Sequence, residues 1–133
     1  MKLTNQNTGE IQIGEFIINK KIKPSDLKAL QEEVKCKLSN EGQGWKLYEI
    51  DNLNDGESMV SLYFKNNRII KVFIELGINY INYSLSEIEF EVKNKIKDLG
   101  GEKVYSWGKI KLIKDSKTFV CFISIEYEFH THM

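Results

Sequence analysis

The sequence contains few of the residues on which common catalytic chemistries depend. Its 133 residues include one arginine (Arg68), two cysteines and two histidines. His130 and His132 both lie in the last four residues, so a Ser-His or Cys-His pair would have to recruit the C-terminal tail. Cys36 and Cys121 form neither a disulfide framework nor a metal-ligand spacing. We therefore expect no nucleophilic catalysis and no metal site.

The chain also lacks net charge and long apolar runs. Nineteen Lys and Arg residues balance nineteen Asp and Glu residues, whereas a general nucleic-acid binder needs a basic excess to release counterions. No window approaches the roughly 18 apolar residues of a membrane span, and the first residues do not form a signal sequence. We expect a cytoplasmic protein that binds neither nucleic acid nor membranes. Its richness in Lys, Ile and Asn suggests a bacterial coding sequence.

Glycine and acidic patterns typical of cofactor sites are missing. The glycines at 9 and 14 and at 42 and 44 do not have the spacing of a dinucleotide or phosphate loop. The loop from Asp51 to Gly56 matches part of a calcium loop, but leucines, Leu53 and Leu62, occupy two ligand positions. We expect no cofactor.

What the sequence does contain is strongly patterned β-structure in one domain, residues 1–133. Residues 57–76 read as a hairpin of two apolar-alternating runs. A two-residue loop at its tip would put the two apolar sets on opposite faces. We therefore predict a three-residue loop over residues 65–67, which sets Leu62 opposite Ile70 and places Asn67 in the left-handed conformation.

A first helix is predicted to begin at Pro24, the only proline, and to end near Leu38. Asp26 would lie in its first turn, favourably placed against the helix dipole. Its apolar stripe would consist of Leu27, Leu30, Val34 and Leu38. Cys36 would point away from that stripe and be exposed.

A second helix has clearer boundaries. Ser84 and Glu87 form a capping-box pattern, and Gly100-Gly101 ends the segment. The apolar stripe consists of Leu85, Ile88, Val92, Ile96 and Leu99. Phe90 lies off this stripe, so either another segment covers it or it faces a partner.

The remaining strands are short and joined by short turns. We predict strands over residues 2–5, 10–13, 15–18 and 45–50, and a last hairpin in which 109–114 and 117–129 flank a two-residue Asp115-Ser116 turn. The element order is β-β-(β)-α-β-β-β-α-β-β. This order predicts an α+β fold with a mostly antiparallel sheet of about six to eight strands and two helices on one face.

Aromatic residues cluster around the second helix and its connectors. They are Tyr80, Tyr83, Phe90, Tyr105 and Trp107. If several are exposed together, they form a recognition patch, because aromatic side chains are enriched where partners dock. The alternative is that Tyr80, Tyr83 and Trp107 seal the helix against the sheet.

These observations favour a small non-enzymatic protein-binding module, such as a bacterial immunity or inhibitor protein acting by stoichiometric binding. The candidate binding residues are Phe90, Glu87, Asp51, Asp55 and Glu57. An acidic surface of this kind could cover a cationic active site and steer association. This hypothesis rests on analogy with inhibitor proteins of similar size and charge pattern.

Two alternatives stay open. The first is a ligand-binding or enzymatic domain with a pocket between sheet and helices, using Tyr63, Tyr105, Trp107 and Glu75. The second is a structural subunit or homodimer that pairs through an exposed edge strand. The sequence leaves monomer and homodimer undecided.

Overall fold

A computed structural model of the chain describes residues 2–13, 16–30, 35–51, 59–76, 84–118 and 120–128. The elements are β1 (Lys2–Asn5), β2 (Glu10–Ile13), β3 (Phe16–Ile18), a 3-10 helix η1 (Pro24–Leu30), β4 (Lys35–Gly42), β5 (Trp45–Asp51), β6 (Met59–Lys65), β7 (Arg68–Glu75), α1 (Leu85–Asp98), β8 (Lys103–Tyr105), β9 (Gly108–Asp115) and β10 (Val120–Tyr127).

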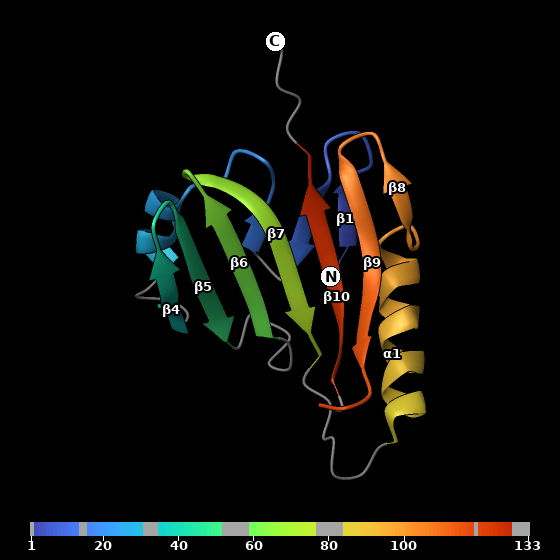
Figure 1. Cartoon of the computed structure of the whole chain (residues 1–133). Helices are drawn as coiled ribbons and strands as arrows, with labels where there is room; N and C mark the ends of the chain where they lie inside the picture. Colours follow the sequence, from blue (N-terminus) through green and yellow to red (C-terminus); the bar gives the residue numbers. More distant parts are fainter. Residues whose placement is uncertain are drawn as a thin grey trace.

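The strands form two sheets. A small sheet has the order β1-β2-β3, and a seven-stranded sheet has the order β4-β5-β6-β7-β10-β9-β8, with antiparallel pairing throughout. Figure 1 shows the small sheet behind the large one, η1 near β4 and β5, and α1 beside β9. The predicted mostly antiparallel sheet is confirmed, and β10 is a central strand. The structure has ten strands and one α-helix among the described residues, so the prediction of two helices is wrong.

The core lies between the large sheet and the elements behind it. The buried stripe of α1 is Ile88, Val92 and Ile96, with Leu99 following, as the sequence predicts. These side chains pack against the buried face of β9 and β10, where Ile110, Cys121, Ile123 and Ile125 are almost fully inaccessible. Burying one such side chain stabilises the fold by roughly 1.5–3 kcal/mol.

The boundaries of α1 follow from its capping residues. The Ser84 hydroxyl accepts a hydrogen bond from the Glu87 backbone N–H, and the Glu87 carboxylate accepts one from the Ser84 N–H, each at 3.2 Å. At the other end the Gly101 N–H donates to the Ile96 carbonyl, and Gly100 has a φ of +103°. The predicted capping box is confirmed. Among the described helices, none combines the length and apolar character needed to cross a bilayer.

The predicted helix from Pro24 to Leu38 is wrong. The helical segment ends at Leu30, and β4 begins at Lys35 and pairs with β5. Cys36 lies opposite Ile50 and is only 8% exposed, while Leu38 is 41% exposed, the reverse of the prediction. Leucine spacing favours a helix only weakly, and pairing along a neighbouring strand overrides it.

The tip of the β6–β7 hairpin also differs from the prediction. The loop has two residues, Asn66 and Asn67, with φ angles of 52° and 64°, so Lys65 pairs with Arg68. A bulge between Tyr63 and Phe64 in the register then shifts the ladder, so that Leu62 lies opposite Val72. The bulge resolves the face mismatch that argued against a two-residue loop, because one inserted residue restores the alternation. The left-handed Asn67 is confirmed.

The last hairpin has a longer loop than predicted. Val120 pairs with Asp115, which leaves four residues between the strands instead of two. Leu112 therefore lies opposite Ile123, whereas the prediction placed Phe119, which lies outside the described residues, at that position. The register moves by an even number of residues, so the same side chains still face the core.

Candidate functional site

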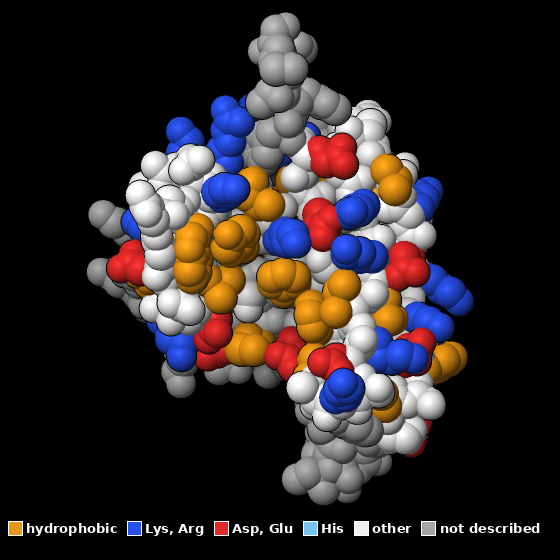
Figure 2. Space-filling model, in the orientation of Figure 1, with side chains coloured by type: hydrophobic (Ala, Val, Ile, Leu, Met, Phe, Trp, Pro, Cys, Tyr) orange, Lys and Arg blue, Asp and Glu red, His pale blue; other side chains and the backbone are white. Residues whose placement is uncertain are grey.

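The large sheet has one covered and one uncovered face. Val60, Leu62 and Phe64 of β6 point to the covered face and are at most 1% exposed. Their neighbours Ser61 and Tyr63 point the other way and are half-buried. Figure 2 shows this second face, over which no described element lies. We call it the outer face: the outward-pointing side chains of β5, β6, β7, β10 and β9.

One part of the outer face is apolar and aromatic. Trp45 of β5 and Tyr63 of β6 lie with ring centroids 6.0 Å apart at 32°, and Leu47 pairs with Tyr63 across the ladder. Phe73 of β7 and Phe122 of β10 meet edge to face at 5.5 Å. Figure 2 shows apolar side chains gathered over this part of the sheet. Packing against cross-strand neighbours leaves these side chains half-buried although no described element covers the face.

The adjoining part carries a cluster of charges, which we call the lysine cluster: Lys71, Lys109 and Lys111 around Glu126. Their ammonium nitrogens lie 3.5, 3.1 and 3.2 Å from the Glu126 carboxylate oxygens. Burial raises the pKa of Glu126, but hydrogen bonds from Lys109 and Lys111 more than offset this and hold that pKa below its ordinary value. Glu126 is therefore a charged anchor for three lysines.

Strand register places the apolar part and the lysine cluster in continuous rows. One row crosses the sheet through Tyr63, Lys71, Glu126, Lys109 and Val104, each opposite the next. Val104, on the edge strand β8, is 74% exposed. The outer face is therefore one surface on which apolar side chains and the lysine cluster lie side by side.

A buried hydroxyl lies within this surface. Ser124 pairs with Phe73 on one side and Lys111 on the other, which places it on the outer face. It is 1% exposed, and its Oγ has no hydrogen-bond partner among the described atoms. The flanking side chains are therefore packed closely enough to exclude water from the middle of the face.

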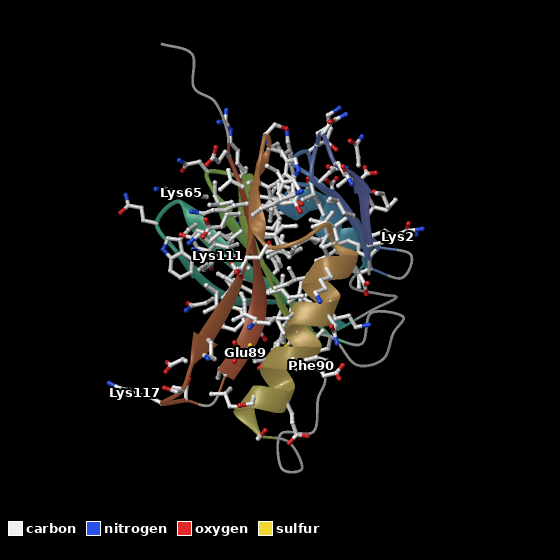
Figure 3. All side chains as sticks on the ribbon, turned by 90° about the vertical axis from the view of Figure 1, so that its right-hand side faces the viewer. Lys2, Lys65, Glu89, Phe90, Lys111 and Lys117 are labelled. Carbon is white, nitrogen blue, oxygen red and sulfur yellow. The ribbon has the colours of Figure 1, made fainter. Side chains whose placement is uncertain are left out.

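Of the predicted binding residues that the structure describes, Phe90 and Glu87 lie together on α1, and Asp51 lies apart from them. Phe90 is 62% exposed on α1 and borders a shallow depression of about 280 Å³ with Ser86, Glu87 and Glu91. Asp51 is the last residue of β5. Side chains along β5 alternate between the two faces of the sheet, and this alternation places Asp51 on the outer face, on the other side of the sheet from α1. Asp55, Glu57, Tyr80 and Tyr83 lie outside the described residues. In Figure 3, Phe90 is labelled on the helix, while Lys65 projects on the side away from Lys2.

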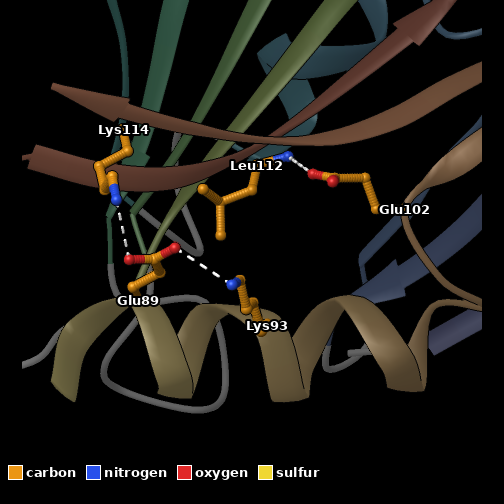
Figure 4. A network of polar contacts seen from close by, with 5 residues as sticks. All are labelled: Glu89, Lys93, Glu102, Leu112 and Lys114. Atoms are coloured by element: carbon orange, nitrogen blue, oxygen red, sulfur yellow. Dashed lines mark hydrogen bonds and ion pairs between the residues drawn. The ribbon is translucent and has the colours of Figure 1, made fainter. Parts of the chain in front are cut away.

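The charged side chains of α1 that face the sheet hold the helix in place. Glu89 Oε2 lies 3.0 Å from Lys114 Nζ of β9, and Glu89 Oε1 lies 3.1 Å from Lys93 Nζ (Figure 4). The hydrogen bond from Lys114, with that from Lys93, lowers the pKa of Glu89. Nearby, the Glu102 carboxylate accepts a hydrogen bond from the Leu112 N–H. Because the two lysines favour the charged form of Glu89, this carboxylate is suited to fastening α1 to β9 rather than to proton transfer.

Trp107 and Tyr105 lie away from the outer face. Trp107 is 2% exposed and stacks on Tyr105 at 5.0 Å and 17°, with Tyr127 at 5.5 Å on another side. A Cβ added to Gly9 would lie 2.4 Å from the indole, so the indole is packed against the β1–β2 turn. Trp107 is therefore a core residue between the two sheets.

The proposed pocket residues are also separated. Tyr63 and Glu75 point to the outer face, while Tyr105 and Trp107 lie by the small sheet. The largest described depression near Trp107 has a volume of about 370 Å³ and a polar rim. In that rim, the Asn19 carboxamide binds the Lys21 N–H and the Glu10 carboxylate. Asn19, Glu10 and the Lys21 N–H are thus engaged with one another, whereas the buried Trp107 indole N–H that borders the same depression has no hydrogen-bond partner among the described atoms.

The two thiols and the metal-binding residue types give little support for catalysis. Cys36 and Cys121 are buried free thiols, and burial raises the pKa of each. A raised pKa lowers the thiolate fraction and hence nucleophilicity. Within the described part of the chain, no three His, Cys, Asp or Glu residues lie close enough together to hold a metal ion.

Comparison with known proteins does not assign a role to the chain, so the assignment rests on the geometry of the structure. No protein-family model matches the chain, and no solved structure matches it significantly. The outer face escaped the sequence reasoning, although a signal was present. Strands 59–65 and 68–75 carry large apolar side chains on both faces, whereas a strand with one solvated face alternates apolar with polar residues.

Proposed function

We propose that the protein is a small non-enzymatic binding module that docks another protein on its outer face. The observation that carries this proposal is a group of half-buried aromatic side chains that no described element covers, beside the lysine cluster: Trp45, Tyr63, Phe73 and Phe122. Contiguous apolar surface rimmed by polar groups is typical of protein–protein interaction sites. Aromatic anchors contribute much of the binding energy in such sites.

The electrostatics support binding over catalysis. Glu89 and Glu126 both have lowered pKa values because lysines hold them in the charged form. A general acid or base at neutral pH would instead need a carboxyl pKa raised toward 7. These carboxylates are better explained as structural anchors.

A cytoplasmic protein that acts by stoichiometric binding, such as a bacterial immunity or inhibitor protein, fits this proposal. The outer face lies on backbone ladders rather than on loops, so its side chains are held in place before a partner arrives. A preorganised surface loses less conformational entropy on association, which favours tight one-to-one complexes.

Small-molecule binding remains the second candidate. The depression beside Trp107 has about 370 Å³, within the usual range of ligand sites. Titration with small molecules that shift the Trp107 fluorescence, without any change at the outer face, would favour this candidate.

The test is capture of a partner by tagged wild-type protein and by three matched variants. Tyr63→Glu places a charge in the apolar part of the outer face and should abolish capture of a one-to-one partner. Ile17→Glu changes an apolar side chain, 49% exposed, on the small sheet and should retain the partner. Loss on Phe90→Glu alone would move the docking site to α1, and capture that no variant affects would refute the outer-face proposal.

A further inference from the structure

From the charges on the outer face, we infer the kind of partner: a protein surface or segment that presents carboxylates beside apolar side chains. This inference rests on the proposed function and names the chemistry of its site. Three ammonium groups from two strands, β7 and β9, converge on the single carboxylate of Glu126 in β10. The cluster therefore has two positive charges in excess.

The distribution of contacts leaves donors free for a partner. Glu126 Oε1 forms ion pairs with the ammonium groups of Lys71 and Lys111, and Glu126 Oε2 forms one with that of Lys109. Each lysine side chain remains about 40% exposed (42%, 41% and 39%), while that of Glu126 is 15% exposed. An ammonium group has three N–H donors, so each lysine can bind Glu126 and still donate outward. The carboxylate holds the lysines in position and leaves their exposed sides available.

Desolvation determines what can cover this face. A purely apolar partner on Phe73 and Phe122 would also cover the neighbouring lysine cluster, because Lys111 lies two positions from Phe73 in the same row, with Ser124 between them. Removing the uncompensated positive charge of the lysine cluster from water is strongly unfavourable, although each lysine contacts Glu126. A partner with two or more carboxylates opposite the cluster would neutralise the excess charge, and its apolar groups would pack on the aromatic side chains.

A single-stranded nucleic acid is the competing class, because it also binds lysines and aromatic rings. The formal net charge is zero, so no wider basic field supports a polyanion. A nucleic-acid groove would need a basic path along the strand, whereas the excess here is two charges at one place. The local excess and the zero net charge favour an acidic protein surface.

The test uses defined probes rather than an unknown partner. We would titrate ¹⁵N-labelled wild-type protein with a random glutamate–tyrosine copolymer, with polyglutamate and with oligo(dT), and map the amide shifts. We expect the copolymer to bind most tightly and to shift the amides of β6, β7, β9 and β10. Preferred binding of oligo(dT), or copolymer shifts confined to other elements, would overturn the inference.

Matched variants separate the lysine cluster from general electrostatic attraction. Lys71→Gln, Lys109→Gln and Lys111→Gln combined should weaken copolymer binding by about tenfold or more. Lys2→Gln, Lys21→Gln and Lys97→Gln combined remove the same charge from exposed lysines elsewhere and should change affinity by less than about twofold. Equal losses in the two triples would overturn the inference. The single variant Lys111→Gln repeats the test if the triple variant unfolds.

The two proposals fail in different ways. If the copolymer does not bind but Tyr63→Glu still abolishes capture of a protein partner, the acidic character of the partner is refuted and the docking face stands. If the wild type captures no partner that depends on Tyr63 and the copolymer produces no shifts at the outer face, both proposals fail. Doubling of the molecular mass in sedimentation, abolished by Tyr63→Glu, would identify the occupant as a second copy and overturn the inference.

Discussion

The Tyr127 hydroxyl donates a 2.8 Å hydrogen bond to the carbonyl oxygen of Gly9, 118 residues earlier in the chain. Tyr127 belongs to β10 of the large sheet, and Gly9 belongs to the turn between β1 and β2 of the small sheet. Burial, with a smaller contribution from Glu10, raises the pKa of Tyr127 far above its ordinary value. This bond fixes the small sheet behind β10, an interior strand of the large sheet, on the side opposite the outer face.

Replacing Tyr127 by Phe should destabilise the fold by about 1–3 kcal/mol, because the Gly9 carbonyl would lose its buried donor. Urea unfolding measures this change. Tyr105→Phe removes a hydrogen bond to Gly101 from a more exposed position and is the control, with an expected loss of about 0.5–1 kcal/mol. Equal stability of wild type and Tyr127→Phe would contradict the proposed link between the sheets.

Gly9→Ala should destabilise by more than Gly101→Ala. Both glycines have positive φ angles, +74° and +107°, so both substitutions strain the backbone. A Cβ at Gly9 would also lie 2.4 Å from the Trp107 indole, while nothing lies within 4 Å of a Cβ at Gly101. Thermal unfolding of the two variants isolates the Trp107 contact. Equal melting temperatures would show that the indole moves aside without loss.

The lysine cluster should make stability depend on pH in the acid range. The pKa of Glu126 is lower in the folded protein than its ordinary value of 4.5, so the contribution of Glu126 to stability is fully present above about pH 4.5. It is lost as the pH falls through the folded-state pKa. Glu126→Gln should therefore be less stable than wild type at pH 7, with the difference shrinking below pH 4.5. A difference that stays constant down to pH 3 would contradict this role.

Both thiols should react slowly in the native protein. Cys36 is 8% exposed and Cys121 is 0% exposed, and burial raises both pKa values. With an aromatic disulfide reagent at pH 8, we expect slow labelling that becomes rapid in denaturant, with Cys121 the slower of the two. Cys36→Ser and Cys121→Ser variants assign the rates. Rapid labelling of native Cys36 would indicate that β4 is not paired as described.

Local signals in the sequence were enough for some elements and not for others. The capping residues Ser84 and Glu87 and the stripe through Ile88 predicted α1 because a helix is specified by neighbours in sequence. The strand from Lys35 to Gly42 depends on pairing with β5, so leucine spacing misled the helix prediction there. Loop lengths were missed because a bulge near Tyr63 and an even shift at the last hairpin both preserve the core face.

The candidate site was the least predictable feature. The sequence placed Phe90 off the apolar stripe of its helix and left open whether another segment covers it, and the structure leaves it 62% exposed. The outer face joins Tyr63, Lys71, Glu126 and Lys109 from four strands, and the order β6-β7-β10-β9 that aligns them is not local in sequence. Strand order therefore had to be known before these residues could be recognised as neighbours.

Hydroxyl-radical footprinting of the free protein and of its complex with a captured partner tests the central claim most directly. Oxidation rates report the solvent exposure of individual aromatic side chains. The account predicts that Trp45, Tyr63, Phe73 and Phe122 become protected in the complex while Phe90 continues to react. Protection of Phe90, with unchanged rates at those four residues, would contradict docking on the outer face.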